Sequence, residues 1–354
     1  MKKMIFTLSL SIMAVLLVPG LFSVALSQNR ILNQKPILKP IPAEKLVVRK
    51  SLMAYQAVPV ERVTQKRARN ILQSFQEKSS AAMQFERVRN LKGRFLFTSS
   101  QDPSAVFDIN RQTGSFLLNF GLKKYSNEGS TRNLPSSGNA PELARKYLEE
   151  TGILPKNEKE IVLAHVGGLN MAVAKDGKRK GNYKKLVTVQ FSRVLNGMPV
   201  QGPGSRLLVH LGEQGSLAGM IKNWSDVKAV PVTKAEKKND QVIQREIQDR
   251  LRRMAGQARD IKIEKSSMVL YDDGLGRIEP AMYVLAMARY EGPGREGVVE
   301  IPVDFYVPLL KQPKALFPYM KSREAKGPGG DKKQKTLKMV PSARSAGQDQ
   351  TDMK

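Results

Sequence analysis

The chain has 354 residues, a formal net charge of +27 at pH 7 and no cysteine. The lack of cysteine excludes disulfides, a thiolate nucleophile and a lipid anchor on cysteine. The length suits two domains, and a charge this high attracts polyanions without specifying a fold.

Residues 1–27 have the pattern of a secretory signal peptide. Two lysines precede an apolar run from Met4 to Val18, and the small residues of Ala25-Leu26-Ser27 predict cleavage after Ser27. An uncleaved anchor helix is the alternative, because this segment is nearly long enough to span a bilayer. Cleavage removes two of the 59 basic residues and no acid, so the net charge falls from +27 to +25. We expect a bacterial protein that is secreted, periplasmic or in the cell envelope, without a transmembrane span once the signal is removed.

Residues 28–62 are rich in proline and basic residues, which predicts an extended arm. Residues 63–125 predict a first α+β module. Its helix has Thr64 as a candidate N-cap, and its strands include a hairpin with a turn at Asn110 to Gly114.

Residues 126–139 predict a polar linker, and residues 140–320 a longer α+β region. Its first helix is capped by Asn139 and ends at Gly152. Strands follow, and then a second long helix, which a capping box of Thr233 and Glu236 opens. Three more strands close the region, and the polar, basic composition of residues 321–354 predicts a disordered tail.

A helix followed by antiparallel strands, and then the same order again, predicts the α+β class, built from repeated helix-on-antiparallel-sheet modules. The last strand contains Pro302, which cannot donate a hydrogen bond to a ladder. We therefore expect this strand at an edge of its sheet, where it would be able to add to the sheet of a partner.

The glycine cluster around residues 197–204 raises the question of a phosphate-binding loop. Pro203 stands where a P-loop needs lysine, and a strand follows where a dinucleotide-binding loop needs a helix. We interpret the cluster as a turn. Ser205 lacks the surroundings of a serine hydrolase nucleophile, and His165 and His210 are not in a zinc-peptidase motif. His210 reads as a sheet-face histidine.

Paired acids offer the remaining catalytic candidates. A carboxylate-based hydrolase would use Glu149-Glu150 or Asp272-Asp273 as its catalytic pair. A calcium site would use Asp272, Asp273 and Glu279 as ligands. Adjacent acids point apart and the spacing is not that of an EF-hand, so a turn is the favoured interpretation. We expect no catalytic residue, metal or cofactor. No basic-aromatic array is present, so nucleic acid would be bound only through phosphates, without sequence preference.

Residues 184–231 resemble the N-terminal propeptide module of thermolysin-type peptidases. The shared parts are Phe191-Ser192-Arg193, the turn from Asn196 to Gly202, the strand Leu207-Leu208-Val209 and the turn from Gly212 to Gly215. The downstream segment is similar to the companion PepSY module, from Thr233-Lys234-Ala235-Glu236 through SSMVLYDDG and PAMYVLAMARY to VEIPVDFYV. In the first unit, VFDINRQTGSF resembles the closing hairpin of a PepSY module.

The resemblance covers about half of the chain, and no peptidase domain follows it. It implies a stand-alone prodomain-like protein, since prodomains of this family assist the folding of their peptidase and inhibit it. We expect a secreted, non-enzymatic protein that binds an extracellular or envelope protein such as a peptidase. A basic polyanion-binding envelope protein is the alternative. The candidate interaction residues are Arg193, Asn196, Pro199, Arg206, Trp224 and Pro302.

Overall fold

The computed structural model describes residues 37–38, 52–79, 83–121, 125–175, 178–291 and 297–318. The predicted signal peptide, the predicted tail and most of the predicted arm lie outside the described residues.

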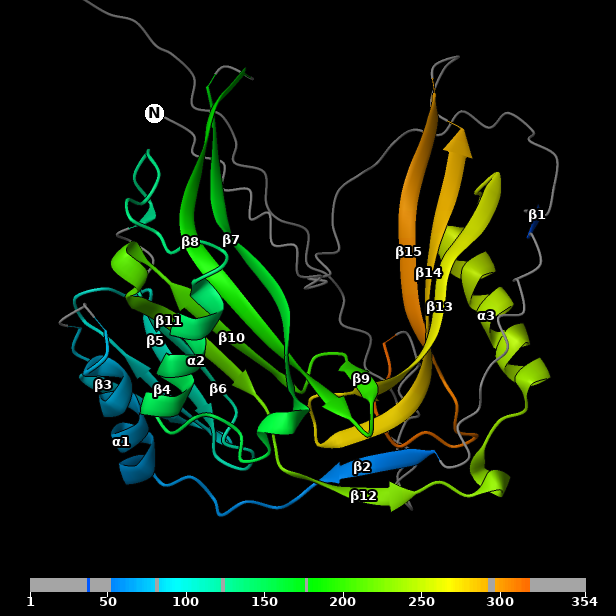
Figure 1. The fold of residues 1–354 in the computed structure, drawn as a ribbon, viewed down its shortest axis with the longest axis horizontal. Helices are drawn as coiled ribbons and strands as arrows, with labels where there is room; N and C mark the ends of the chain where they lie inside the picture. The colour runs from blue at the N-terminus through cyan, green and yellow to red at the C-terminus, as the bar shows by residue number, and fades with distance from the viewer. Residues whose placement is uncertain are drawn as a thin grey trace, which may run out of the picture. The chain divides into compact units, whose positions relative to one another are not determined.

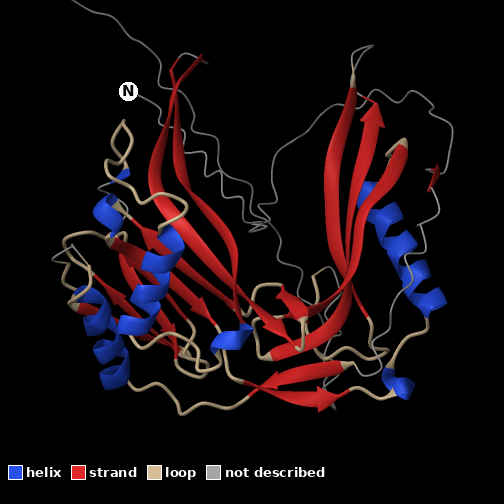
Figure 2. Cartoon of the chain, viewed as in Figure 1, coloured by secondary structure: helices blue, strands red, loops and turns tan. Residues whose placement is uncertain are grey.

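The described chain is mostly β-sheet, so the predicted repeats of a helix on its own antiparallel sheet are wrong. One sheet of 15 strands accompanies three α-helices of 12, 11 and 16 residues in the described part (Figure 2). The sheet is mixed, because β1 (Ile37–Leu38) and β9 (Met198–Gln201) pair in parallel with β13 (Asp260–Asp272).

The physical reason for this error is strand pairing between the expected modules. β6 (Phe116–Phe120) is hydrogen-bonded to β11 (Leu217–Asn223), far along the chain. A sheet that ended at β6 would expose a row of unpaired N–H and C=O groups, and this pairing satisfies them. Sequence periodicity identifies each strand but does not identify its neighbour.

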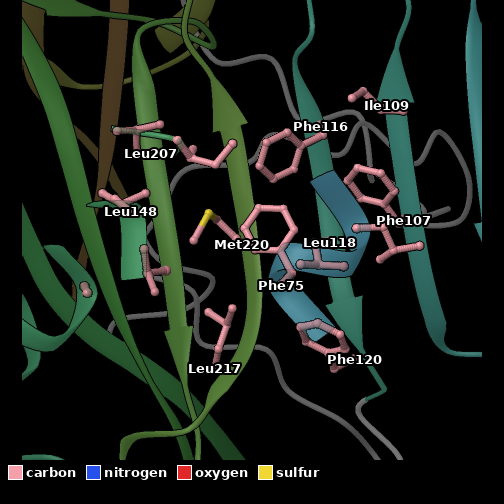
Figure 3. Packing of buried hydrophobic residues seen from close by; sticks show 14 of the residues in the cluster. Phe75, Phe107, Ile109, Phe116, Leu118, Phe120, Leu148, Leu207, Leu217 and Met220 are labelled. Carbon is pink, nitrogen blue, oxygen red and sulfur yellow. The ribbon is translucent and has the colours of Figure 1, made fainter. Parts of the chain in front are cut away.

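The first helix forms as the sequence predicts. α1 (Gln65–Gln76) begins where the Thr64 hydroxyl accepts a hydrogen bond from the Arg67 amide at 3.2 Å. Its apolar face includes Phe75, whose ring centre lies 5.4 Å from that of Phe116 and 6.4 Å from that of Phe107 (Figure 3). This core lies on strands β3 (Arg87–Leu91), β4 (Arg94–Thr98), β5 (Ala105–Asn110) and β6.

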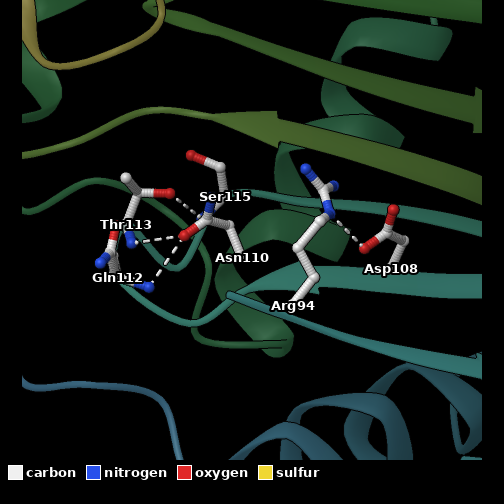
Figure 4. Close-up of polar contacts among 6 residues, drawn as sticks. All are labelled: Arg94, Asp108, Asn110, Gln112, Thr113 and Ser115. Carbon is white, nitrogen blue, oxygen red and sulfur yellow. Dashed lines mark hydrogen bonds and ion pairs between the residues drawn. The ribbon is translucent and has the colours of Figure 1, made fainter. Parts of the chain in front are cut away.

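The predicted hairpin turn between β5 and β6 is also confirmed. The Asn110 side-chain oxygen accepts hydrogen bonds from the amides of Gln112 at 2.8 Å and Thr113 at 3.1 Å (Figure 4). An asparagine that binds the backbone two and three residues ahead holds the chain in a turn. Beside it, Arg94 pairs with Asp108 across the two neighbouring strands at 2.7 Å.

α2 (Ala140–Glu150) covers the same core from the direction of β8 (Lys178–Leu195) and β10 (Arg206–Leu211). Asn139 is the N-cap residue as predicted, but its side chain makes no capping hydrogen bond. Gly152 follows the helix with φ +66°, a conformation that favours glycine. β7 (Ile161–Lys175) then forms a long antiparallel hairpin with β8.

A second core lies between α3 (Asp240–Ala255) and the antiparallel strands β13, β14 (Arg277–Glu291) and β15 (Val298–Pro308) (Figure 1). The capping box of Thr233 and Glu236 forms, but it closes a single 3-10 turn. α3 begins later, where the Asn239 side chain accepts from the Val242 amide at 2.8 Å. β2 (Met53–Ala57) and β12 (Val227–Pro231) pair with each other, and β2 also pairs with β14.

Candidate functional site

Two of the predicted interaction residues, Arg193 and Trp224, lie together and are buried. The Arg193 guanidinium pairs with Glu160 at 2.5 Å, donates to the Ser225 carbonyl at 2.8 Å and lies over the Trp224 ring at 4.8 Å. Their exposed fractions are only 3% and 4%. A partner protein has little access to either side chain, so both act within the fold.

Asn196 lies in the tight turn between β8 and β9, and Pro199 lies on β9, where it pairs with Val194. Asn196 and Gly197 both have positive φ, 49° and 72°, and Leu195 pairs with Met198. This is the asparagine-glycine geometry of a two-residue hairpin. The Asn196 side chain also donates to the Tyr55 hydroxyl at 2.8 Å, which ties β2 to this turn. Asn196 and Pro199 are both exposed.

Arg206 begins β10 and pairs with Ser192 on one side and Asn223 on the other. Its side chain is partly buried, and burial lowers the pKa of its guanidinium. Its Nε atom is buried and has no hydrogen-bond partner among the described residues. Arg206 therefore packs within the sheet. It does not form a single surface with the other predicted interaction residues.

The glycine cluster packs closely against the buried Asp272. The sequence does not indicate this contact. A β-carbon added to Gly204 would lie 2.1 Å from the Asp272 carboxylate carbon. The Ser205 hydroxyl donates to that carboxylate at 2.5 Å. The turn interpretation holds, and the reason for glycine at this position is the close approach of the Asp272 side chain.

Of the carboxylates considered for catalysis or calcium, Glu149 and Glu150 pair with basic side chains, whereas Asp272, Asp273 and Glu279 accept hydrogen bonds from backbone amides. Asp273 accepts from Leu275 at 2.7 Å and from Leu316 at 3.1 Å, and Glu279 accepts from the Lys314 amide at 2.9 Å. Burial raises the pKa of Glu279, and burial also raises the pKa of Asp272 against the hydrogen bond from Ser205. Among the described residues, no group of three or more acids or histidines is arranged to hold a metal ion. These carboxylates hold loops in place.

A cavity of about 450 Å³ lies beside β2 and β12. Its charged lining residues are Glu236, Arg277, Glu279, Lys311 and Lys314. Glu236 accepts hydrogen bonds from Thr233, and Glu279 holds the Lys314 amide, so both acids already have partners.

Pro302 lies on β15, which pairs only with β14 among the described strands, so the predicted edge position is confirmed. The outer side of this edge is protected. Pro302 supplies no donor, and Arg250 of α3 donates to the Tyr306 carbonyl at 2.7 Å. Pro302 and Tyr306 are four residues apart, so their backbone groups point to the same side of the strand. Proline and edge-covering side chains discourage the addition of a further strand.

β7 is an edge of a different kind. It pairs only with β8 among the described strands, over 15 residues. Its sequence from Ile161 to Ala174 contains no charged residue and no proline. Val162 and Leu163 are 37% and 50% exposed. A long, uncharged edge is a template for pairing with another chain, so β7 is the candidate functional site.

The far part of the β7–β8 hairpin is basic. Lys180 and Lys184 are exposed, and no ion pair of the described residues includes either of them. Lys185 differs, because it is 1% exposed and its ammonium group donates to the Asn127 carbonyl at 2.6 Å and to the Gly129 carbonyl. The β7 edge therefore lies near two exposed positive charges that pair with no described acid.

No protein-family model matches this chain, and no curated protein matches it. The chain is similar to a crystal structure of an uncharacterized protein from Eubacterium rectale ATCC 33656, with 11% identity and a TM-score of 0.44, over 77% of this chain and 86% of that one. It is also similar to the Bacillus megaterium YpeB C-terminal domain, with 11% identity and a TM-score of 0.32, over 71% and 95% of the two chains. Likeness at this level carries no argument about function. None of the helices in the described ranges combines the length and apolar character that crossing a bilayer requires.

Proposed function

We propose that the chain is an exported, non-enzymatic binding protein that attaches to an extracellular or cell-envelope protein, with a peptidase as the first candidate. The observation that carries the proposal is the exposure of aliphatic side chains on two edge strands. Val162 and Leu163 are exposed on β7, as are Val298, Val299 and Ile301 on β15. Exposed aliphatic side chains that lie close together on a surface are typical of protein contact sites.

Three further features support this proposal. The sequence of residues 1–27 has the pattern of a signal for export. Residues 184–231 resemble peptidase propeptides, which favours a peptidase as partner. The buried acids Asp273 and Glu279 accept hydrogen bonds from backbone amides of neighbouring loops, which is a structural role.

The test is a pull-down of exported and envelope proteins with the full chain, washed through a salt series and followed by assay of any retained peptidase. We expect a specific protein to stay bound at about 1 M salt, where the Debye length is about 3 Å. A retained peptidase should change its activity or its yield of folded protein when the chain is added. Failure of every exported protein to remain bound would contradict the proposal.

Polyanion binding is the second candidate, favoured by the net charge of +27 and by the exposed Lys180 and Lys184. Binding through phosphate groups releases counterions, so affinity falls steeply as salt rises. If the polyanion function is correct, bound material leaves the column within a few hundred millimolar salt, roughly in the range where phosphate contacts fail. Affinity that hardly changes with salt would exclude it.

A further inference from the structure

We propose that the outer edge of β7, the side away from β8, accepts an extended segment of a partner protein as an added strand, with acidic residues of that segment near Lys180 and Lys184. This inference rests on the proposed binding function and names both the surface and the chemistry of the partner.

The β8 side of the hairpin is occupied from Lys184 to Ser192 in the described part of the chain, by β10 and by residues 130–131. On the β8 side, Thr131 donates its amide to the Lys184 carbonyl and its hydroxyl to the Lys185 carbonyl, each at 2.9 Å. The Lys184 amide in turn donates to the Ser130 hydroxyl at 3.3 Å. On the β7 side, the backbone groups described bond only to β8. Unpaired N–H and C=O groups in a row provide the affinity in strand addition.

The two edge strands differ in the side chains and backbone that they offer. β15 carries Pro302 and the Arg250 contact, whereas β7 has neither proline nor charge between Ile161 and Ala174. The register of β7 shifts between Leu163 and His165, between Leu169 and Asn170, and between Val173 and Ala174. The regular run between the first two shifts, His165 to Leu169, is about as long as a typical strand. We assign the added strand to this run.

The charge of the surroundings selects the occupant. A strand added to β7 lies two strand spacings from β8, about 10 Å, and this is close to the Debye length at 0.1 M salt. Lys184 pairs with Asn170, directly beyond this run, and Lys180 precedes Gly181, which pairs with Val173. Carboxylates at the end of the added strand that passes Asn170 are therefore attracted by Lys184 and, from further away, by Lys180. A second copy of this chain brings its own charge of +27 to the same edge, which disfavours self-pairing.

The test uses a capped synthetic peptide of about ten residues, alternating threonine and valine with a pair of glutamates at one end. Binding to the full chain is followed by fluorescence anisotropy. We expect binding that weakens about tenfold or more when alternate peptide amides are N-methylated, because each methyl group removes a backbone donor. A copy with lysines in place of the glutamates should also bind about tenfold more weakly at low salt.

Two variants separate edge pairing from charge. Leu163→Lys on β7 and Val299→Lys on β15 change side chains that are 50% and 48% exposed, and both add one positive charge. Attraction by charge alone predicts tighter binding of the acidic peptide to both variants. Edge pairing predicts weaker binding, about fivefold, to Leu163→Lys alone, since lysine on an edge strand opposes strand addition.

A second pair of variants tests the position of the acidic end. Lys180→Glu with Lys184→Glu should weaken binding of the acidic peptide, whereas Lys228→Glu with Lys234→Glu makes the same change of net charge at other exposed sites and should weaken it less. Equal losses in the two pairs would overturn the assignment of the acidic end.

Retention of a protein partner by both wild type and Leu163→Lys, with no loss of peptide binding on N-methylation, would overturn the edge assignment and leave the proposed function standing. If no protein partner is retained while peptide binding still depends on the β7 edge, the proposed function is overturned and the edge assignment stands. If the chain forms a dimer through β7 and Leu163→Lys dissociates it, a second copy is the occupant. That result would overturn the assignment of an acidic partner segment to this edge.

Discussion

The Arg193 guanidinium lies 4.8 Å from the centre of the Trp224 ring while pairing with Glu160 at 2.5 Å. These contacts join the end of β8 to the turn that precedes β7 and to the segment that follows β11. Arg193 and Trp224 are almost fully buried, so the motif that suggested a binding surface in the sequence holds three segments of the fold together.

We predict that Arg193→Met lowers the free energy of unfolding by about 3 kcal/mol, because it leaves Glu160 without its cation in a largely buried site. Urea denaturation followed by circular dichroism measures the change.

The matched control is Arg145→Met on α2. Arg145 pairs with Glu149 at 3.0 Å, but their side chains are 41% and 50% exposed. An exposed pair contributes less than about 1 kcal/mol. Equal losses for the two variants would show that the Arg193 cluster has no special structural role.

We predict that Gly204→Ala destabilises the chain by about 2 kcal/mol, as overpacking commonly does. The new β-carbon would meet the Asp272 carboxylate at about 2 Å, so Asp272 must move away from its hydrogen bond with Ser205. Thermal unfolding measures the loss. Gly138→Ala is the control, since its β-carbon meets nothing closer than 3.9 Å.

The double variant Gly204→Ala, Asp272→Ser tests the cause. If the clash with Asp272 is responsible, Gly204→Ala costs much less in the Asp272→Ser background than in wild type. If Gly204→Ala destabilises both backgrounds equally, the cause is a change in the backbone and not the clash with Asp272.

Local signals in the sequence predicted local structure well. Thr64 caps α1, and Asn110 holds the β5–β6 turn. Each of these features depends on residues a few positions apart, and periodicity and side-chain chemistry describe such spacing directly.

Features that depend on distant partners were missed. The sequence gives no reason to pair β6 with β11, or to place Tyr55 of the predicted arm against Asn196. The same limit explains the candidate site: the uncharged run in β7 is visible in the sequence, but its edge position depends on which strand lies beside it. A long strand pattern without charge or proline was the one signal that pointed to it.

We predict that His210 makes the protein less stable as the pH falls from about 6.5 to about 4. Burial lowers the pKa of His210 to about 4, and its Nδ1 atom lies 2.9 Å from the Thr188 hydroxyl. Between these pH values the unfolded chain binds the proton and the folded chain does not, so stability falls with pH by up to about 3 kcal/mol. Urea unfolding at several pH values measures the slope.

His210→Gln should flatten this slope, because it removes the group whose pKa burial lowers. Asp272 and Glu279 act in the opposite direction. Burial raises their pKa values, so as the pH falls toward their ordinary values the folded chain binds protons that the unfolded chain does not, and stability rises. Their contribution is common to wild type and variants, so it cancels in the difference. A slope that His210→Gln does not alter would refute the prediction.

The protection of β15 gives the last prediction. Pro302→Thr restores a backbone donor at the edge, and Arg250→Gln shortens the side chain that binds the Tyr306 carbonyl. With both changes the outer side of β15 offers a row of free donors and acceptors beside the exposed Val299 and Ile301. We expect the double variant to associate at protein concentrations where wild type stays monodisperse, as unprotected edges do.

Sedimentation velocity over a concentration series measures this association, and circular dichroism checks that both proteins are folded. Glu300→Gln, which removes the charge paired with Arg289 but adds no donor to the backbone, is the control for a change in surface charge. Association of the control alone would mean that charge, rather than backbone protection, keeps β15 from pairing. If neither variant associates, Pro302 and Arg250 are not what keeps this edge closed, and the contrast with β7 must come from the side chains of β15.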